Sequence, residues 1–153
     1  MFDRIAPSYD RLNHLLSLDV DKLWRRKAIK MIADGSALRV LDVACGTGDS
    51  TVAIARALPA GGHVVGSDIS EQMMGFVMDK ARAAGVADRV SVELADAENL
   101  PYADASFDRV TCAFGVRNFE HKDRGLAEMY RVLKPGGRVV ILELSVPENK
   151  LVR

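Results

Sequence analysis

Two glycines, Gly46 and Gly48, lie in the stretch LDVACGTGDS, where an apolar run passes into a polar segment. Glycine has no side chain, so it adopts backbone angles that other residues avoid and lets a ligand approach the main chain closely. Dinucleotide-binding turns have the spacing G-x-G-x-x-G, but Thr51 stands where the third glycine would be. The turn therefore disfavours a pyrophosphate ligand and, with it, a nicotinamide-dependent oxidoreductase. A tight turn without any ligand is the other interpretation of a lone glycine pair.

Carboxylates occur at or near the ends of three predicted strands. Asp42 lies four residues before Gly46, so its side chain can meet a cationic group of a ligand bound at the turn. Asp68 can accept hydrogen bonds from both hydroxyls of a ribose, and Asp96 with the amide of Ala97 can read the edge of an adenine ring. The pattern favours a ligand with an ammonium group and a nucleoside. The alternative for Asp68 is that it only caps the helix that follows.

Five runs rich in Val, Ile and Leu predict the strands that position these residues. They cover residues 38–44, 63–68, 89–96, 107–115 and 138–145. A helix is predicted over residues 70–84, with Ser70 as its N-cap and Gly85 as its stop. Because strands alternate with helices, we expect an α/β fold with a parallel sheet and a ligand at the carboxyl ends of its strands.

A further helix is predicted ahead of the last strand and should end at the sequence Pro135-Gly136-Gly137. Its apolar face is expected to comprise Leu126, Met129, Tyr130 and Leu133. The last strand should begin only after the two glycines.

Residues 1–35 contain no strand signal, and their apolar residues recur at helical intervals. They are predicted to form an N-terminal helical extension or lid, and residues 36–153 to form the ligand-binding domain. The stretch from Leu12 to Trp24 has two interpretations, burial against the sheet, which is favoured, or an amphipathic face for a membrane surface. Trp24 is expected to anchor its helix to the domain.

Charge and cysteine content limit the function classes. Lys plus Arg and Asp plus Glu both number 21, so no overall field attracts the chain to nucleic acid. Cys45 and Cys112 do not form a CxxC pair or a metal-ligand cluster, which indicates two reduced thiols. The sequence shows no signal-peptide core and no apolar run of about 20 residues, so we expect a soluble, cytoplasmic protein without a bound metal.

Several motifs carry a resemblance to a known family. LDVACGTGD, SDIS, ADAENLPY and MYRVLKPGG resemble motifs of the class I S-adenosylmethionine-dependent methyltransferases. MFDRIAPSYDRLNHLLSLDVDKLWRR and FGVRNFEHKDRGLAEM narrow the resemblance to the ubiquinone/menaquinone biosynthesis C-methyltransferases, over nearly the whole chain. The resemblance implies a Rossmann-like sheet in the order 3-2-1-4-5. The family's fold adds two strands after the fifth, so the 153 residues are expected to be C-terminally incomplete.

The resemblance also implies S-adenosyl-L-methionine as the cofactor. The residues expected to contact it are Asp42, Gly46, Thr47, Gly48, Asp68, Asp96, Ala97 and Ala113. Within this set, Thr47 and the two glycines are expected to line the methionine part, and Ala113 to supply the small side chain that the family uses at this contact. Cys45, where the family often has glycine, is expected to be a buried thiol packed under the turn and not a nucleophile.

The implied reaction is methylation of a ring carbon of a polyprenylated quinol precursor, such as the conversion of demethylmenaquinol to menaquinol. Arg117 and Asn118 are the expected catalytic residues at the quinol oxygen, while His14 and His121 stay open as proton acceptors. Expected partners are the quinol, the inner face of a membrane in peripheral contact, and a second copy of the chain, but no nucleic acid. The alternatives are a methyltransferase acting on another small molecule and a non-catalytic subunit that binds the cofactor.

Overall fold

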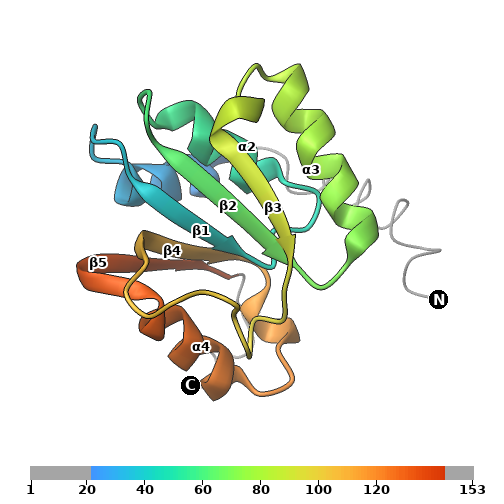
Figure 1. Cartoon of the computed structure of the whole chain (residues 1–153), viewed down its shortest axis with the longest axis vertical. Coiled ribbons are helices and arrows are strands. Elements are labelled where there is room, and N and C mark those ends of the chain that lie inside the picture. The colour runs from blue at the N-terminus through green and yellow to red at the C-terminus, as the bar shows by residue number, and fades with distance from the viewer. Residues whose placement is uncertain (1–21, 144–153) are drawn as a thin grey trace.

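The computed structural model describes residues 22–143, and its centre is a five-stranded sheet. The strands are β1 (Arg39–Val43), β2 (His63–Asp68), β3 (Val90–Leu94), β4 (Phe107–Ala113) and β5 (Leu133–Leu142). Their order is β3-β2-β1-β4-β5, and all neighbouring strands are parallel. Figure 1 shows β1 in the middle of this sheet. The predicted α/β class and strand order are confirmed.

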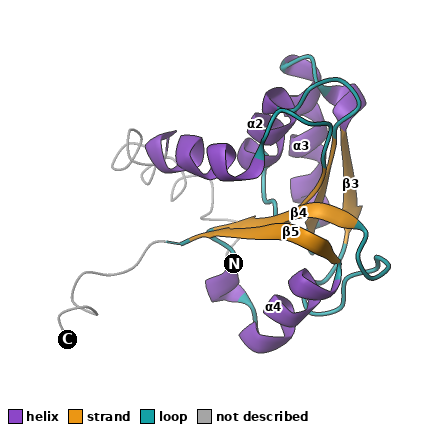
Figure 2. Ribbon diagram, turned by 90° about the vertical axis from the view of Figure 1, so that its left-hand side faces the viewer, coloured by secondary structure: helices purple, strands orange, loops and turns teal. Residues whose placement is uncertain are grey.

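Helices cover both faces of the sheet. They are the helix at residues 22–32, α2 (Asp49–Ala57), α3 (Glu71–Ala83) and α4 (Lys122–Arg131), with short 3-10 turns η1 (Ala87–Arg89) and η2 (Val116–Asn118). Figure 2 shows α2, α3 and the helix at 22–32 on one face and α4 on the other. Within residues 22–143, no helix is long and apolar enough to cross a membrane.

The core is built by alternation along the strands. In β1, Val40 packs with buried residues of α2 and α3, whereas Leu41 and Val43 point to the other face and pack with Met129 of α4. Successive side chains of a strand point to opposite faces, so a sheet covered on both sides needs apolar residues at neighbouring positions, as at Val40 and Leu41.

The helix predicted over residues 70–84 is α3, and its end signals are confirmed. The side chain of Ser70 accepts a hydrogen bond from the amide of Met73 at 3.4 Å. Gly85 follows the helix with a φ of +74°. Val77 and Ala81 are fully buried, as expected for the apolar face of this helix.

The predicted boundary between the last helix and the last strand is wrong. α4 ends at Arg131 and β5 already begins at Leu133, so the Pro-Gly-Gly sequence lies inside the strand. Leu133 pairs with Phe107, and the register between β4 and β5 shifts before the next pair, so the strand accommodates these residues as an irregularity.

Tyr130 does not belong to the apolar face of α4, because 68% of its surface is exposed. The fully buried positions of this helix are Gly125 and Met129, which are four residues apart and therefore share one face. Tyr130 follows Met129 by one residue, which turns its side chain about 100° towards solvent.

The helix at 22–32 is fixed to the domain at its carboxyl end. Arg138 of β5 donates to the carbonyl of Met31 at 2.9 Å, and Arg109 of β4 donates to the carbonyl of Ile32 at 3.0 Å. These bonds satisfy carbonyls that a helix end leaves free. Ile32 is buried, but Trp24 is 42% exposed, so the prediction that Trp24 anchors this helix is wrong.

Several predictions concern segments outside the described residues. They include most of the N-terminal extension with its Leu12-to-Trp24 stretch, the lid over the cofactor and His14 as a proton acceptor. The last predicted strand reached residue 145, whereas β5 ends at Leu142 and the description ends at residue 143.

Candidate functional site

The turn after β1 has left-handed backbone conformations at Ala44, Gly46 and Gly48, with φ of +55°, +57° and +94°. At Gly48 an added Cβ would lie 2.8 Å from a methyl group of Val77 and 3.0 Å from its Cα, so α3 packs directly on this glycine. At Gly46 an added Cβ would meet nothing within 4 Å. The turn is therefore closed on the α3 side and open at Gly46, where a ligand can approach the main chain.

Asp68, at the end of β2, binds this turn directly. Its Oδ2 accepts a hydrogen bond from the amide of Gly46 at 2.8 Å, and its Oδ1 accepts one from the amide of Ser70 at 3.0 Å. A carboxylate offers about four lone-pair sites, so both oxygens retain capacity to accept further bonds. Since Ser70 caps α3 with its own side chain, Asp68 does more than cap that helix.

Asp42 lies beneath the turn and only 1% of its surface is exposed. The hydroxyl of Thr51, in α2, donates to Asp42 Oδ2 at 2.6 Å. Burial raises the pKa of Asp42 to about 7; the Thr51 hydrogen bond opposes this rise, and the charge of Asp68 adds to it. The pair fixes the first turn of α2 to the carboxyl end of β1. That Asp42 meets a ligand's ammonium group stays a prediction.

Thr47 is tied to α3 through Lys80. The Lys80 ammonium donates to Thr47 Oγ1 at 3.0 Å and to Asp49 Oδ1 at 2.7 Å. Sequence reasoning missed Lys80 and the supporting role of Thr51. Lys80 is 33 residues from Thr47, and only the packing of α2 against α3 brings the two together.

Cys45 is a packed thiol, as expected, but it is only partly buried. It lies against Gly66 of β2, where an added Cβ would be 3.1 Å from Cys45 Sγ. Burial raises the pKa of the Cys45 thiol far above its ordinary value, and the carboxylates of Asp42 and Asp68 raise it further. A thiol that stays protonated is a poor nucleophile.

Asp96 and Ala97 lie beyond β3, not at its end as predicted, because the strand stops at Leu94. The side chain of Asp96 is exposed, and its Oδ1 accepts a hydrogen bond from the amide of Glu98 at 2.9 Å. Ala97 packs against the core on the α4 face. Their contact with an adenine stays a prediction.

Two residues of α4 hold the loop that carries Asp96. Arg131 donates to the carbonyls of Leu100 and Tyr102 at 2.9 and 2.8 Å, and Glu128 accepts from the amide of Leu100 at 2.8 Å. Arg131 and Glu128 also bind each other, at 2.8 Å. Arg131 of the motif MYRVLKPGG therefore stabilises the loop after β3 through hydrogen bonds to its backbone.

The turn after β4 abuts the turn after β1. Phe114 has a φ of +61°, and a Cβ added at Gly115 would lie 2.8 Å from the Cβ of Ala44. Arg117 and Asn118, in η2, are both exposed, and the amide of Arg117 donates to a carboxylate oxygen of Glu143 at 3.2 Å. The structure thus brings the predicted acceptor residues onto a turn that neighbours the glycine-rich turn. Sequence reasoning did not identify Glu143.

Ala113 ends β4 and is partly buried. With Ser50 and Thr111 it lines a small slot between the strand ends and the helix at 22–32. Its position at the carboxyl edge agrees with the expected placement, while its contact with a cofactor stays a prediction.

The described histidines are engaged with other side chains. His121 Nδ1 lies 3.0 Å from Glu98 Oε1, and its amide donates to Glu98 Oε2 at 2.9 Å. His63 opens β2 at the edge opposite the glycine-rich turn, where its Nε2 lies 2.9 Å from Ser91 Oγ.

Comparison with known proteins extends these observations. The model of the ubiE/COQ5 methyltransferase family matches residues 1–153. The chain is 50% identical to the Ubiquinone/menaquinone biosynthesis C-methyltransferase UbiE of Geobacter sulfurreducens, covering 100% of this chain and 60% of that protein. It is 48% identical to the demethylmenaquinone methyltransferase of Bacteroides fragilis, covering 97% of this chain and 60% of that one.

The fold is shared with a crystal structure of a SAM-dependent methyltransferase from Aquifex aeolicus. The TM-score is 0.70 at 24% identity, over 78% of this chain and 63% of the other. The chain thus spans about 60% of the length of these two curated relatives. Nearly all of its own residues align both with these relatives and with the family model. It belongs to the ubiE/COQ5 methyltransferase family.

Proposed function

We propose that this chain binds S-adenosyl-L-methionine at the carboxyl edge of its sheet and directs methyl transfer to a ring carbon of a polyprenylated quinol. The proposal rests on the position of Asp68. Its carboxylate accepts a hydrogen bond from the amide of Gly46 and can accept further hydrogen bonds beside the open part of the turn. Membership of the ubiE/COQ5 methyltransferase family supports the choice of cofactor and reaction.

The residues present fit this cofactor. Asp68 offers carboxylate oxygens to the ribose hydroxyls, and the open main chain at Gly46 lies next to it. Asp96 and Ala97 provide a carboxylate and an amide for the adenine edge. A dinucleotide fits less well, because Thr51 occupies the position of the third glycine and is buried with its hydroxyl on Asp42.

S-adenosyl-L-methionine, when bound, supplies an electrophilic methyl group. The chain's part is to hold the acceptor carbon about 3 Å from that group and in line with the bond that breaks. A quinol carbon becomes nucleophilic as the neighbouring hydroxyl loses its proton. Arg117 cannot take this proton, since guanidinium stays charged, so the proton passes to water at this exposed turn and Arg117 stabilises the developing phenolate. Asn118 orients the ring oxygen, and S-adenosylhomocysteine would be the leaving group of the transfer.

The acceptor that fits this proposal is demethylmenaquinol, and the corresponding ubiquinone precursor is the second choice. Two of the relatives carry names that refer to these quinones or their biosynthesis. A polyprenyl tail is apolar, so a cytoplasmic enzyme meets this substrate at the inner face of a membrane.

The proposal includes pairing of two chains through β5. This strand lies at an edge of the described sheet and exposes Ile141, and such edges favour pairing with another strand. Sedimentation equilibrium tests this part: a species of twice the chain's mass supports it, and a monomer at all concentrations excludes it.

Methyl transfer to a short-chain demethylmenaquinol tests the proposed roles. We expect Arg117→Ala to lower turnover at least ~100-fold, the loss typical of one removed electrostatic stabiliser, while the affinity for S-adenosylhomocysteine is unchanged. Lys122→Ala, which removes an exposed cation at the start of α4, is the matched control and should keep full turnover. Retained turnover in Arg117→Ala would remove this residue from the mechanism.

A further inference from the structure

The helix at 22–32 concentrates positive charge in a chain whose charges otherwise balance. Its sequence, KLWRRKAIKMI, contains five cations and no acidic residue. They are Lys22, Arg25, Arg26, Lys27 and Lys30. This local excess is hidden in the composition, where 21 basic residues meet 21 acidic ones.

The fold adds a sixth cation to this group. Arg56, near the end of α2, lines an open hollow of about 350 Å³ together with Lys22, Arg25 and Arg26. Ile29 and Ala53 complete the lining. Among the described residues, the hollow is therefore lined by four cations and two apolar side chains, with no acidic group to neutralise the charge.

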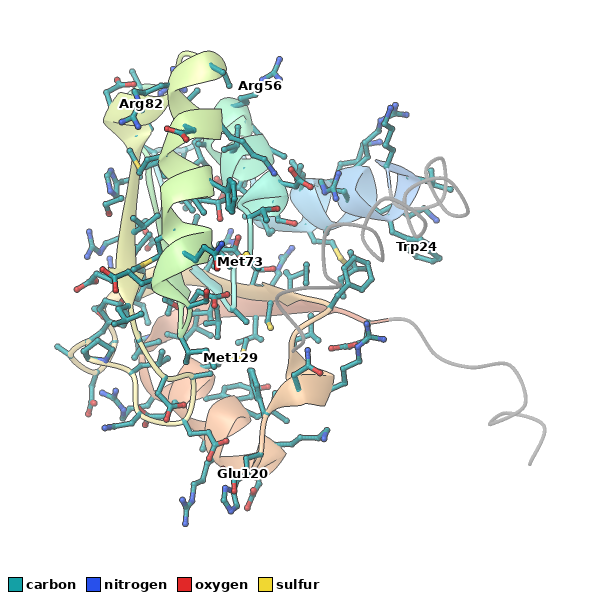
Figure 3. All side chains as sticks on the ribbon, turned by 90° about the vertical axis from the view of Figure 1, so that its right-hand side faces the viewer. Trp24, Arg56, Met73, Arg82, Glu120 and Met129 are labelled. Atoms are coloured by element: carbon teal, nitrogen blue, oxygen red, sulfur yellow. The ribbon has the colours of Figure 1, made fainter. Side chains whose placement is uncertain are left out.

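Large apolar side chains stand beside these cations in solvent. Leu23, Trp24 and Met31 are 49%, 42% and 55% exposed. Trp24 and Met31 are seven residues apart, so they follow one edge of the helix, and the Lys27 ammonium lies 4.8 Å above the Trp24 ring. Figure 3 shows Trp24 towards the end of this helix that is remote from α3.

The opposite edge of the exposed face is basic. Lys22 and Arg26 are four residues apart and share that edge, next to the hollow that Arg56 completes. A cationic edge and an apolar edge on one exposed helical face are the arrangement of helices that lie in a membrane interface.

We propose that this face is a docking surface for an anionic lipid bilayer, with lipid phosphates at the hollow and Trp24 with Met31 among the headgroups. Nucleic acid supplies phosphates but no apolar layer to receive Leu23, Trp24 and Met31 together, so a bilayer fits the face better. The inference deepens the proposed function, on which its link to a prenylated acceptor rests, by assigning the membrane contact to a defined surface.

Trp24 is the single tryptophan of the chain, so its fluorescence reports on this face alone. We expect vesicles of phosphatidylcholine with about one-third phosphatidylglycerol to sediment the chain and to shift the emission to the blue at low salt. Vesicles of phosphatidylcholine alone should do neither, and added salt should weaken the binding, since a polybasic surface binds through screened charges.

The variant Lys22→Gln/Arg26→Gln/Arg56→Gln tests the basic edge and the hollow beside it. Each lost cation should weaken binding about fivefold, so the triple variant should bind anionic vesicles roughly 100-fold less tightly. The matched control, Arg82→Gln/Lys122→Gln/Arg124→Gln, removes three exposed cations from α3 and α4 and should bind as the unchanged chain does. Equal melting temperatures ensure that both variants are folded.

Three results would overturn the inference: equal losses in the two triple variants, vesicle binding without a blue shift of Trp24, or tighter binding to an oligonucleotide than to anionic vesicles. The last would identify a nucleic-acid surface instead. Titration with S-adenosylhomocysteine is measured separately on the same samples, so the proposed function and this inference can each fail alone.

Discussion

The turns that follow β1 and β4 share a left-handed backbone conformation at their first residue, but they differ in the interactions that stabilise them. Each strand is followed by a non-glycine residue with positive φ, Ala44 in one turn and Phe114 in the other. The first turn is then fixed by side chains from three elements, among them Asp68, Lys80 and Thr51. The difference indicates that the first turn, the proposed cofactor site, is pre-organised by side chains, whereas the second turn, the proposed acceptor site, is held by fewer of them.

The second turn has mainly backbone support among the described residues. The amide of Phe114 donates to the carbonyl of Leu142 at 2.6 Å, and the amide of Asn118 donates to the carbonyl of Gly115 at 3.0 Å. The side chains of Arg117 and Asn118 are exposed. Substitutions in the first turn should therefore alter stability, and those in the second should alter turnover.

The largest expected effect is that of Gly48→Ala. The new Cβ would collide with Val77 and force a strained φ, at a cost of about 3 kcal/mol in the free energy of unfolding. Gly46→Ala is the matched control, since it has the strained φ without the collision and should cost about 1 kcal/mol. Urea denaturation measures both, and equal costs would show that α3 does not hold the turn closed.

Asp42→Asn should change how stability depends on pH. The folded-state pKa of about 7 lies above the unfolded value, so the native chain holds an extra proton and its stability falls as the pH rises from about 4 to about 7. The asparagine variant lacks this loss, so its stability relative to the unchanged chain should rise by up to about 1.4 kcal/mol per pH unit in that window.

The difference between the two proteins isolates Asp42. Burial lowers the pKa of His63, which gives a slope of opposite sign in both proteins and cancels in the comparison. Thermal unfolding at pH 5, 6 and 7 provides the curves. Parallel curves would mean that Asp42 is ionised under the turn throughout this range.

Lys80→Gln should have a smaller effect on stability. The ion pair with Asp49 is partly exposed on both sides, and such pairs contribute about 0.5 kcal/mol. Because Lys80 also holds the Thr47 hydroxyl, we expect a several-fold weaker affinity for S-adenosylhomocysteine, measured by calorimetry. Arg82→Gln, on the same helix, is the control, and an equal loss of affinity there would assign the effect to net charge.

Arg117→Ala should have the smallest effect on stability, below about 0.5 kcal/mol, because its side chain is exposed. Chemical denaturation and the methyl-transfer assay together distinguish the two turns, because Arg117→Ala in the second turn should keep its stability and lose turnover. A stability loss above about 1 kcal/mol, well outside this range, would show that the second turn is also held by its side chains.

Local signals predicted much of the fold. Apolar runs located the five strands, and Ser70 with Gly85 bounded α3, because caps and stops depend on neighbouring residues. Tyr130 and the start of β5 were mispredicted. Helical spacing alone did not show which face the sheet covers, and pairing of Leu133 with Phe107 overrides the Pro-Gly signal.

The candidate site was predictable where residue type and strand position combine, as at Asp68. The supports of the turn were not, since Lys80 and Arg131 act on residues about 30 positions away and leave no local pattern. Trp24 illustrates the same limit, since a tryptophan in a helix is usually buried, yet the fold leaves this one at the surface.

Calorimetric titration with S-adenosylhomocysteine, comparing the unchanged chain with Asp68→Ala, tests the central claim that the β1 turn and Asp68 form the cofactor site. We predict saturable binding at one site for the unchanged chain, at least a tenfold weaker affinity for Asp68→Ala, and no binding of NADH to either. Equal affinity in the two proteins, or saturable binding of NADH, would contradict the account.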